Sequence, residues 1–146
     1  MAAVVRSRHG RSDGFESLTE VYLSRLPQYT PVETKTFRSE AVFLEAVAGL
    51  RTRTAPVVVL LDGRGKAFSS QEFAAWIGRQ RDGGVQNLIF AVGPADGWSE
   101  EARGSAGLLL SLGAMTMPHE LARVVLAEQV YRAFTILAGH PYHDGH

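Results

Sequence analysis

Short, continuous apolar runs along the chain predict its strands. Three of these runs are rich in valine, isoleucine or leucine: PVVVLLD (56–62), NLIFAV (87–92) and GLLLSL (107–112). Runs of this kind are typical of strands that are buried on both faces of a parallel sheet. Two weaker patterns precede them, because AAVV (2–5) fits a short strand and VETKTF (32–37) alternates between apolar and polar positions. We therefore expect five strands.

Helical spacing of apolar residues marks most of the segments between these runs. In one of them, SSQE has the form of a capping box, in which Ser69 caps a helix and Glu72 reaches back to its first residue. Pro118 is expected in the first turn of the last helix. The expected helices span residues 15–26, 39–50, 69–81, 100–103 and 119–137. Strands and helices that alternate with short connections predict an α/β fold with a largely parallel sheet, in one domain over residues 1–146.

Three glycine-containing loops follow the three apolar strands. They are LLDGRGK (60–66), VGPADGW (92–98) and SLGAMTMP (111–118), and the first continues as a loop to Phe68. Because ligands of parallel sheets bind outside the carboxyl ends of the strands, these loops are the candidate binding site. None of them has the glycine pattern of a Rossmann-type dinucleotide site or of a P-loop. The loops therefore fit a binding site, or simple turns between strands and helices.

The last helix carries charges on one stripe and apolar side chains on the opposite face. Leu121, Val125, Glu128 and Arg132 share the stripe, and Glu128 and Arg132 are spaced so that they can pair. The opposite face is apolar at Ala122, Leu126, Val130, Ala133, Phe134 and Leu137. Two interpretations stay open. The helix forms a subunit interface with Arg132 near its edge, or it is an ordinary core helix with a snorkelling arginine.

Composition and charge restrict the class of protein. The 15 basic and 15 acidic residues give a formal net charge of zero, which argues against a strongly basic nucleic-acid binder. The basic clusters RSRHGR (6–11) and RTR (51–53) could still contact phosphate, or could lie in solvated loops. The sequence has no cysteine, no apolar run of about 18 residues and no apolar stretch typical of a signal peptide near its start. We expect a cytoplasmic protein without a membrane span.

The C-terminal stretch HPYHDGH raises the possibility of a metal site. His140, His143 and His146 could in principle bind a metal ion. No carboxylate or histidine at helical spacing supports them, and the end of a chain is a poor cage for a metal. We therefore expect no metal.

The segment MTMPHELARVVLAEQVYRAFTILAGHPYH (115–143) resembles the C-terminal signature of the RlmH family. Weaker similarity extends back through LLDGRGKAFSSQEFA (60–74) and GPADGWS (93–99). Members of this family are SPOUT-superfamily methyltransferases that methylate N3 of a pseudouridine in the 23S ribosomal RNA of the large subunit. The resemblance implies a SPOUT-type α/β fold with a deep trefoil knot, a homodimer, ribosomal RNA as partner and S-adenosylmethionine as methyl donor.

The resemblance also implies which residues form the site. Backbone groups of eight residues would hold the cofactor: Leu61, Gly93, Leu112, Gly113, Ala114, Met115, Thr116 and Met117. Four side chains are expected near the reaction: His119, Arg132, Tyr142 and His143. Our hypothesis is that Arg132 orients phosphate or the uracil oxygens. Tyr142 and His143 would reach the target base from the second subunit.

One departure from the family pattern leaves two alternatives open. Val92 stands where the family usually has the first of two adjacent glycines, and it adds a side chain beside the expected cofactor. One alternative is a divergent relative that keeps the fold and the dimer, has lost turnover, and binds RNA or the ribosome. The other is a methyltransferase that acts on a different RNA.

Overall fold

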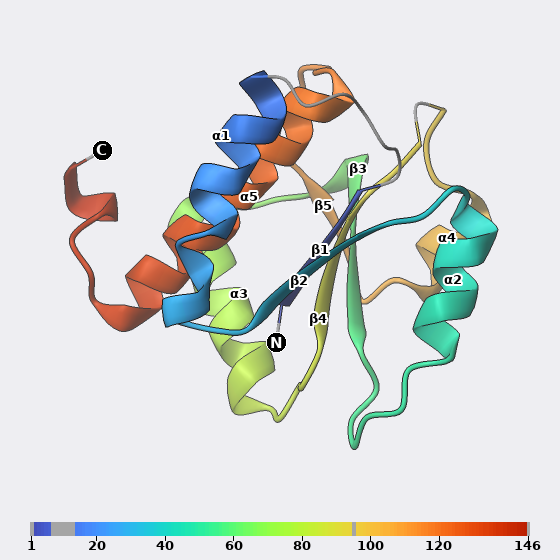
Figure 1. Ribbon diagram of the computed structural model, residues 1–146, viewed down its shortest axis with the longest axis horizontal. Helices are drawn as coiled ribbons and strands as arrows, with labels where there is room; N and C mark the ends of the chain where they lie inside the picture. The colour runs from blue at the N-terminus through green and yellow to red at the C-terminus, as the bar shows by residue number, and fades with distance from the viewer. Residues whose placement is uncertain (1, 7–13, 95, 146) are drawn as a thin grey trace.

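The computed structural model describes residues 2–6, 14–94 and 96–145. Within them, one sheet has the strand order β2-β1-β4-β3-β5, and every pair of neighbouring strands is parallel (Figure 1). The strands are β1 (Ala2–Arg6), β2 (Val32–Thr36), β3 (Val57–Ala67), β4 (Leu88–Val92) and β5 (Leu108–Ser111). The expected α/β fold with a parallel sheet is confirmed.

Helices cover both faces of this sheet. α1, α3 and α5 pack on one face, and α2 and α4 lie on the other (Figure 1). The α-helices are α1 (Gly14–Leu23), α2 (Glu40–Ala48), α3 (Ser70–Asp82), α4 (Glu100–Ser105) and α5 (His119–Ala138), and two short 3₁₀ helices are η1 (Leu26–Gln28) and η2 (His143–Gly145). The expected helix over residues 15–26 ends earlier than predicted, and η1 follows after a turn.

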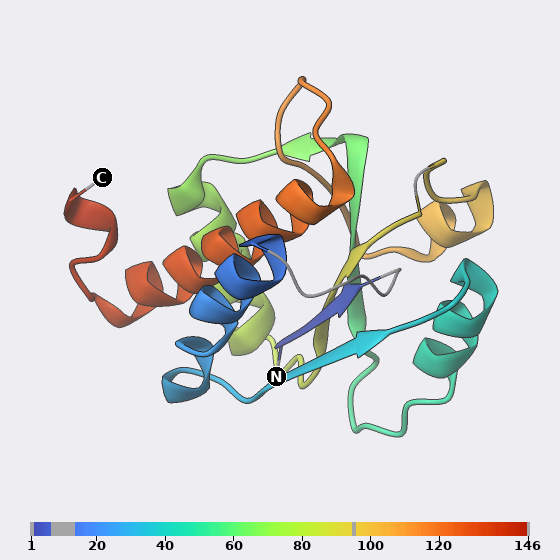
Figure 2. The same ribbon diagram turned by 45° about the horizontal axis from the view of Figure 1, so that its top comes forward.

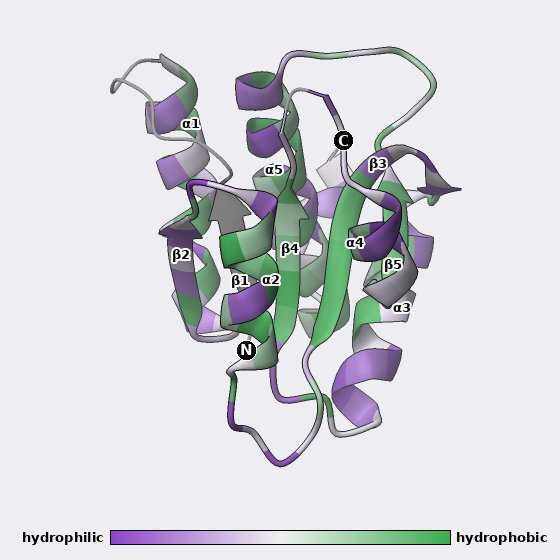
Figure 3. Ribbon diagram, turned by 90° about the vertical axis from the view of Figure 1, so that its right-hand side faces the viewer, coloured by the Kyte–Doolittle hydropathy of each residue, from purple (hydrophilic) through white to green (hydrophobic). Residues whose placement is uncertain are grey.

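The first half of β3 and all of β4 are continuously apolar because they separate two cores. Along β3 and β4, Val59 and Phe90 face the core under α1, α3 and α5, whereas Leu60 and Ile89 face the core under α2 and α4. Figure 3 shows these central strands as apolar ribbons between helices of mixed polarity. Full burial of a side chain such as Phe90 stabilises the fold by about 2–3 kcal/mol.

β3 is longer than the sequence predicted. The expected strand ends at Asp62 and a loop follows, but β3 continues to Ala67. After a register shift beyond Leu61, Lys66 and Ala67 pair with Leu110 and Ser111 of β5. The apolar pattern does not reveal this extension, because the half of β3 after Asp62 is largely exposed and is held by backbone pairing.

Local signals at the helix ends are largely confirmed. Ser69 Oγ accepts from Glu72 N at 3.0 Å and Glu72 Oε1 accepts from Ser69 N at 2.7 Å, which completes the predicted capping box. These hydrogen bonds hold the pKa of the Glu72 carboxyl below its usual value. Pro118 is the N-cap of α5 and precedes the first turn in which it was expected. α5 ends at Gly139, whose φ of 73° favours glycine.

Candidate cofactor and substrate sites

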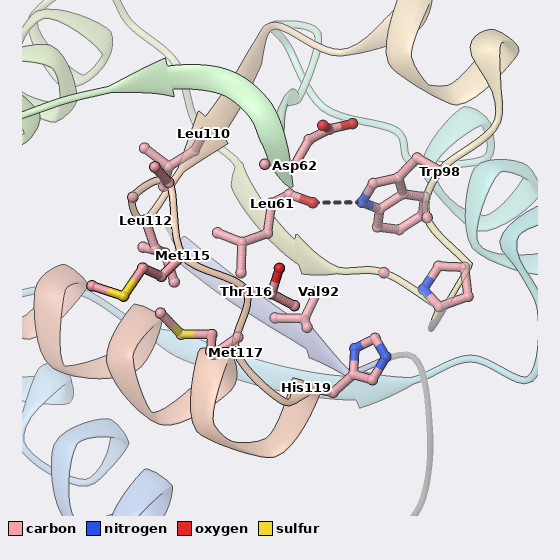
Figure 4. A pocket seen from close by; sticks show the side chains of 17 residues that line it. Leu61, Asp62, Val92, Trp98, Leu110, Leu112, Met115, Thr116, Met117 and His119 are labelled. Atoms are coloured by element: carbon pink, nitrogen blue, oxygen red, sulfur yellow. Dashed lines mark hydrogen bonds between the residues drawn. The ribbon is translucent and has the colours of Figure 1, made fainter.

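A pocket of about 330 Å³ lies at the carboxyl ends of β4 and β5 and beside the middle of β3 (Figure 4). Its lining includes the eight predicted cofactor residues: Leu61, Gly93, Leu112, Gly113, Ala114, Met115, Thr116 and Met117. His119 and Val92 also line it. The structure thus brings the three predicted loops together at one edge of the sheet. Their role in binding a cofactor remains a prediction.

Trp98 joins two of these loops, and the sequence analysis missed it. Its indole Nε1 donates to the carbonyl oxygen of Leu61 at 3.0 Å (Figure 4). A Cβ on Gly93 would lie 2.5 Å from the indole ring, so this position has room only for glycine. On its other side the indole packs against Phe43, with 5.7 Å between the ring centroids. Trp98 therefore holds the middle of β3 and the end of β4 in a fixed relation.

Asp62 ties the middle of β3 to α4. Its carboxylate has an exposed fraction of only 8%; it accepts from Arg64 N at 2.8 Å and lies 3.1 Å from Arg103 Nε. The aspartate follows the predicted apolar strand directly, so its position was visible in the sequence. Its partner on α4, Arg103, could not be predicted from the sequence.

The loop after β5 turns sharply at Gly113. Ser111 Oγ accepts from Gly113 N at 3.1 Å and donates to Gly113 O at 3.0 Å. The φ of Gly113 is 137°, which side chains other than glycine rarely adopt. This turn sets the path of the loop, and the side chain of Met115 on it is 87% exposed.

The pocket fits a small cofactor held largely by backbone groups. Its volume lies within the range of about 300–1,000 Å³ that is usual for small-molecule sites. Apolar side chains and glycines dominate the lining, and Asp62, Thr116 and His119 are its polar side chains. Val92 is buried at the end of β4, and its side chain lines the pocket without filling it.

A second cluster of predicted residues lies at the carboxyl end of α5. Arg132 binds Glu128 in a bidentate manner, with Nε at 3.0 Å and 3.2 Å from the two carboxylate oxygens and Nη2 at 2.9 Å from one of them. The predicted pair is therefore confirmed. Arg132 Nη1 lies 3.0 Å from His143 Nδ1, and the guanidinium carbon lies 5.0 Å from the centre of the Tyr142 ring. The structure brings Arg132, Tyr142 and His143 together.

This environment sets the protonation of two of these groups. Hydrogen bonding to Glu128 raises the pKa of Arg132 above its usual value, so the guanidinium stays charged. Burial, together with the negative charge of Glu128, raises the pKa of Tyr142 to about 12. The Tyr142 hydroxyl, which donates to Glu128 Oε2 at 3.2 Å, is therefore neutral near pH 7 and cannot act as a base there.

We expect the raised pKa of Tyr142 to appear in an alkaline titration. Between pH 10 and 12, Tyr142 is ionised in the unfolded chain and neutral in the folded chain. The environment of the neutral hydroxyl therefore contributes fully to the free energy of unfolding below pH 10, and this contribution is lost as the pH rises through 12. The difference in phenolate absorbance between the wild type and Tyr142→Phe should have its midpoint near pH 12. A midpoint near pH 10 would contradict the buried, Glu128-bonded environment.

The two groups of predicted residues lie far apart in one chain. His119 is the first residue of α5, and Arg132 comes thirteen residues later, which is about 20 Å along a helix. Figure 2 shows the loop before α5 and the C-terminal tail at opposite ends of this helix. Of the four expected reaction residues, His119 alone lies beside the pocket within its own chain.

The apolar face of α5 is covered by its own chain. Ala122, Leu126, Val130 and Ala133 are buried, and Phe134 and Leu137 pack against the same core. The interpretation of this face as a subunit interface is therefore wrong, and the core-helix interpretation holds for it. On the charged stripe, by contrast, Leu121 is 39% exposed.

The structure also bears on the two basic clusters, the possible metal site and the possible membrane span. RTR (51–53) lies in the connection before β3, at the amino ends of the strands and opposite the pocket, and it is largely exposed. RSRHGR and His146 fall outside the described residues, apart from Arg6. In the described ranges, no group of three or more histidine, cysteine or acidic residues could hold a metal ion. No helix in them is long and apolar enough to cross a membrane.

Comparison with known proteins identifies the family. The family described as "Predicted SPOUT methyltransferase" matches residues 3–143. The chain belongs to the SPOUT methyltransferase family. It is 52% identical over 136 residues to the ribosomal RNA large subunit methyltransferase H of Koribacter versatilis, and the match covers 93% of this chain and 92% of that protein. The protein of the same name from Brucella ovis is 56% identical over 86 residues, which cover 59% of this chain and 51% of that protein.

A solved SPOUT structure has the same fold. The SpoU methyltransferase AviRb of Streptomyces viridochromogenes, in complex with its cofactor AdoMet, matches with a TM-score of 0.51 and 11% identity. The match covers 96% of this chain and 58% of that chain. At this identity the likeness concerns the fold alone.

Proposed function

We propose that this protein transfers a methyl group from S-adenosylmethionine to large-subunit ribosomal RNA, at N3 of a pseudouridine, as a cytoplasmic single-domain SPOUT enzyme. The observation that supports this most is the pocket beside the middle of β3 and the carboxyl ends of β4 and β5, which assembles all eight predicted cofactor residues from three separate segments of the chain. A family match over residues 3–143 and a relative 52% identical over most of both chains support the same reaction.

The residues that would hold the cofactor are those of the three loops. When bound, S-adenosylmethionine supplies a methyl group on a sulfonium centre, which is already a good electrophile. Leu61, Gly93 and the segment 112–117 would bind it mainly through backbone groups. The clamp made by Trp98 and the turn at Gly113 would hold these loops in place before binding. Most of the rate gain would then come from proximity and orientation.

We propose that a homodimer completes the site. Arg132 lies about 15 Å along α5 beyond Ala122, the last residue of this helix that lines the pocket, and Tyr142 and His143 contact Arg132 at that far end. All three are too far away to contact a base held in the pocket of their own chain. In a second copy, packed with its α5 end against the pocket, they would be near. Exposed apolar side chains support such packing, with Phe15, Leu18 and Val21 on α1 and Leu121 on α5. The deep trefoil knot also belongs to this proposal, on the strength of the family.

The charges of the second cluster suit the substrate. Pseudouridine N3 carries an imide proton, and its loss places negative charge on the flanking uracil oxygens. The charged Arg132 would stabilise this anion or bind a phosphate. The neutral Tyr142 would contact the base without accepting the proton.

The proposal is tested in a strain that lacks the gene. Ribosomal RNA from this strain should lack one N3-methylated pseudouridine by mass spectrometry, and the wild-type protein should restore it. Ala114→Trp should not restore it, because Ala114 is exposed and lines the pocket, so a large side chain would fill the site without disturbing the core. Ala48→Trp, on the exposed end of α2 away from the pocket, is the matched control and should restore methylation.

A calorimetric titration separates this function from its alternatives. The wild type and Ala48→Trp should bind S-adenosylmethionine, and Ala114→Trp should not. If the wild type does not bind at millimolar cofactor, the protein is an RNA-binding relative without turnover. If it binds while ribosomal RNA is unchanged in the deletion strain, the target is another RNA.

A further inference from the structure

The imidazole of His143 is held at both of its nitrogens. Its Nδ1 lies 3.0 Å from Arg132 Nη1, and its Nε2 lies 2.9 Å from the side-chain amide nitrogen, Nε2, of Gln71. Gln71 is the second residue of α3 and precedes His143 by 72 residues. It lies in the first turn of that helix, away from the pocket. Nothing in the sequence indicated that this exposed glutamine meets the C-terminal tail.

Two neighbouring contacts fix the position of Gln71. Ser70 Oγ donates to Gln129 Oε1 on α5 at 2.8 Å, so the start of α3 is tied to the helix that carries Arg132. The capping box of Ser69 and Glu72 fixes the backbone on either side of this link. The Gln71 amide is therefore presented to His143 from a rigid helix end.

The chemistry of the partners decides the form of the imidazole. A guanidinium has only N–H donors, so Nδ1 of His143 must accept and must carry no proton. The single proton of the neutral ring is then on Nε2, which donates. In the structure the amide nitrogen of Gln71 faces His143 Nε2, and two N–H donors cannot pair. The arrangement that satisfies every group therefore exchanges the amide oxygen and nitrogen, which places Gln71 Oε1 toward Nε2–H. A cationic imidazolium would set an N–H group against the guanidinium and break this contact.

The carboxylate of Glu128 is already hydrogen-bonded to two other residues of this cluster. It accepts from Arg132 through both oxygens and from Tyr142 at 3.2 Å. It neutralises the guanidinium and fixes the direction in which Nη1 points at His143. The chain of contacts runs from Glu128 through Arg132 and His143 to Gln71. With the Gln71 amide turned so that Oε1 faces His143, each donor in it meets an acceptor.

We propose that Gln71 is a positioning residue that, together with Arg132, holds His143 as the neutral Nε2–H tautomer. This inference rests on the proposed function, in which His143 meets the target base. In this form His143 has no free lone pair to take the N3 proton. Its Nε2–H is likewise engaged by Gln71, so His143 would meet the target base as a neutral ring of fixed orientation and not as a base.

Nitrogen NMR of protein with ¹⁵N-labelled histidine tests the tautomer directly. The His143 signals, assigned by their loss in His143→Gln, should show a protonated Nε2 and an unprotonated Nδ1 in the wild type. Gln71→Ala should shift them toward a mixture of tautomers, and Gln71→Glu should keep the Nε2–H form because its carboxylate still accepts. Arg79→Ala, an exposed position further along α3, is the matched control and should leave them unchanged. An Nδ1–H tautomer, or unchanged signals in Gln71→Ala, would overturn the proposal.

Kinetics provide the second measurement. We expect Gln71→Ala to lower kcat about tenfold with little change in the KM for S-adenosylmethionine, and Gln71→Glu to recover most of this loss. Equal losses in both variants would indicate a merely structural role and would also overturn the proposal. If the wild type shows the expected tautomer but methylates no ribosomal RNA, the proposed function fails while the positioning by Gln71 stands.

Discussion

Replacing Arg132 with alanine is expected to lower methylation of ribosomal RNA by about 10²- to 10³-fold, the usual loss for one group that stabilises a developing anion. The affinity for S-adenosylmethionine should stay near the wild-type value, because Arg132 lies about 15 Å along α5 from Ala122, the last residue of this helix that lines the pocket. Single-turnover methylation of ribosomal RNA and calorimetry with the cofactor measure the two quantities separately.

The variant should remain folded, so the loss can be assigned to chemistry. Without Arg132, the Glu128 carboxylate still accepts from Tyr142 and from Gln129 Nε2, so it is not left without a hydrogen bond. Arg132→Lys keeps the charge but cannot form the bidentate contact, and we expect an intermediate rate. Arg53→Ala removes an exposed arginine at the opposite edge of the sheet and should have no effect. Full activity of Arg132→Ala would refute its role in the site.

The proposed dimer gives this prediction a further test, because the two halves of the site could be damaged in different chains. Arg132→Ala and Ala114→Trp should each be inactive alone. After subunit exchange at equal amounts, half of the dimers are mixed and each mixed dimer has one intact site, so about a quarter of wild-type activity should return. If no activity returns although mixed dimers form, the site is not shared between subunits.

The sequence predicted those parts of the fold that depend on local pattern. The buried strands follow from apolar runs such as 87–92, because β4 separates two cores and has no polar face. The start of α3 follows from the capping box, which depends on four adjacent residues. The glycine loops pointed to the correct edge of the sheet, since parallel strands bring their carboxyl ends together.

The contacts that shape the site could not be predicted in this way, because they join distant segments. Trp98 follows a glycine loop and resembles any loop aromatic until its hydrogen bond to Leu61, 37 residues away, is seen. Gln71 is an exposed glutamine near a helix start, and its partner lies in the C-terminal tail. The apolar face of α5 suggested a subunit interface because the sequence does not show that α1 and α3 already cover it.

The sequence pattern also did not predict the extension of β3 beyond Asp62. A substitution within this extension, at Gly65, has the largest expected effect on stability. β3 lies so close to β5 at Gly65 that a Cβ there would lie 2.5 Å from the carbonyl carbon of Leu109 and 2.8 Å from Leu110 N. Both obstacles are backbone atoms of a paired strand, so neither can move aside as a side chain would. Gly65→Ala should therefore destabilise the fold by about 3 kcal/mol.

Thermal unfolding measures this effect, and a neighbouring glycine controls for it. A loss of about 3 kcal/mol should lower the Tm by about 10 °C in a chain of this size. Gly63→Ala adds the same methyl group two residues earlier, where no atom lies within 4 Å, and should leave the Tm nearly unchanged. Equal Tm values for the two variants would contradict the close approach of β3 and β5. Because Leu61 on β3 and Leu112 after β5 line the same pocket, Gly65→Ala should also weaken cofactor binding at temperatures where the variant is still folded.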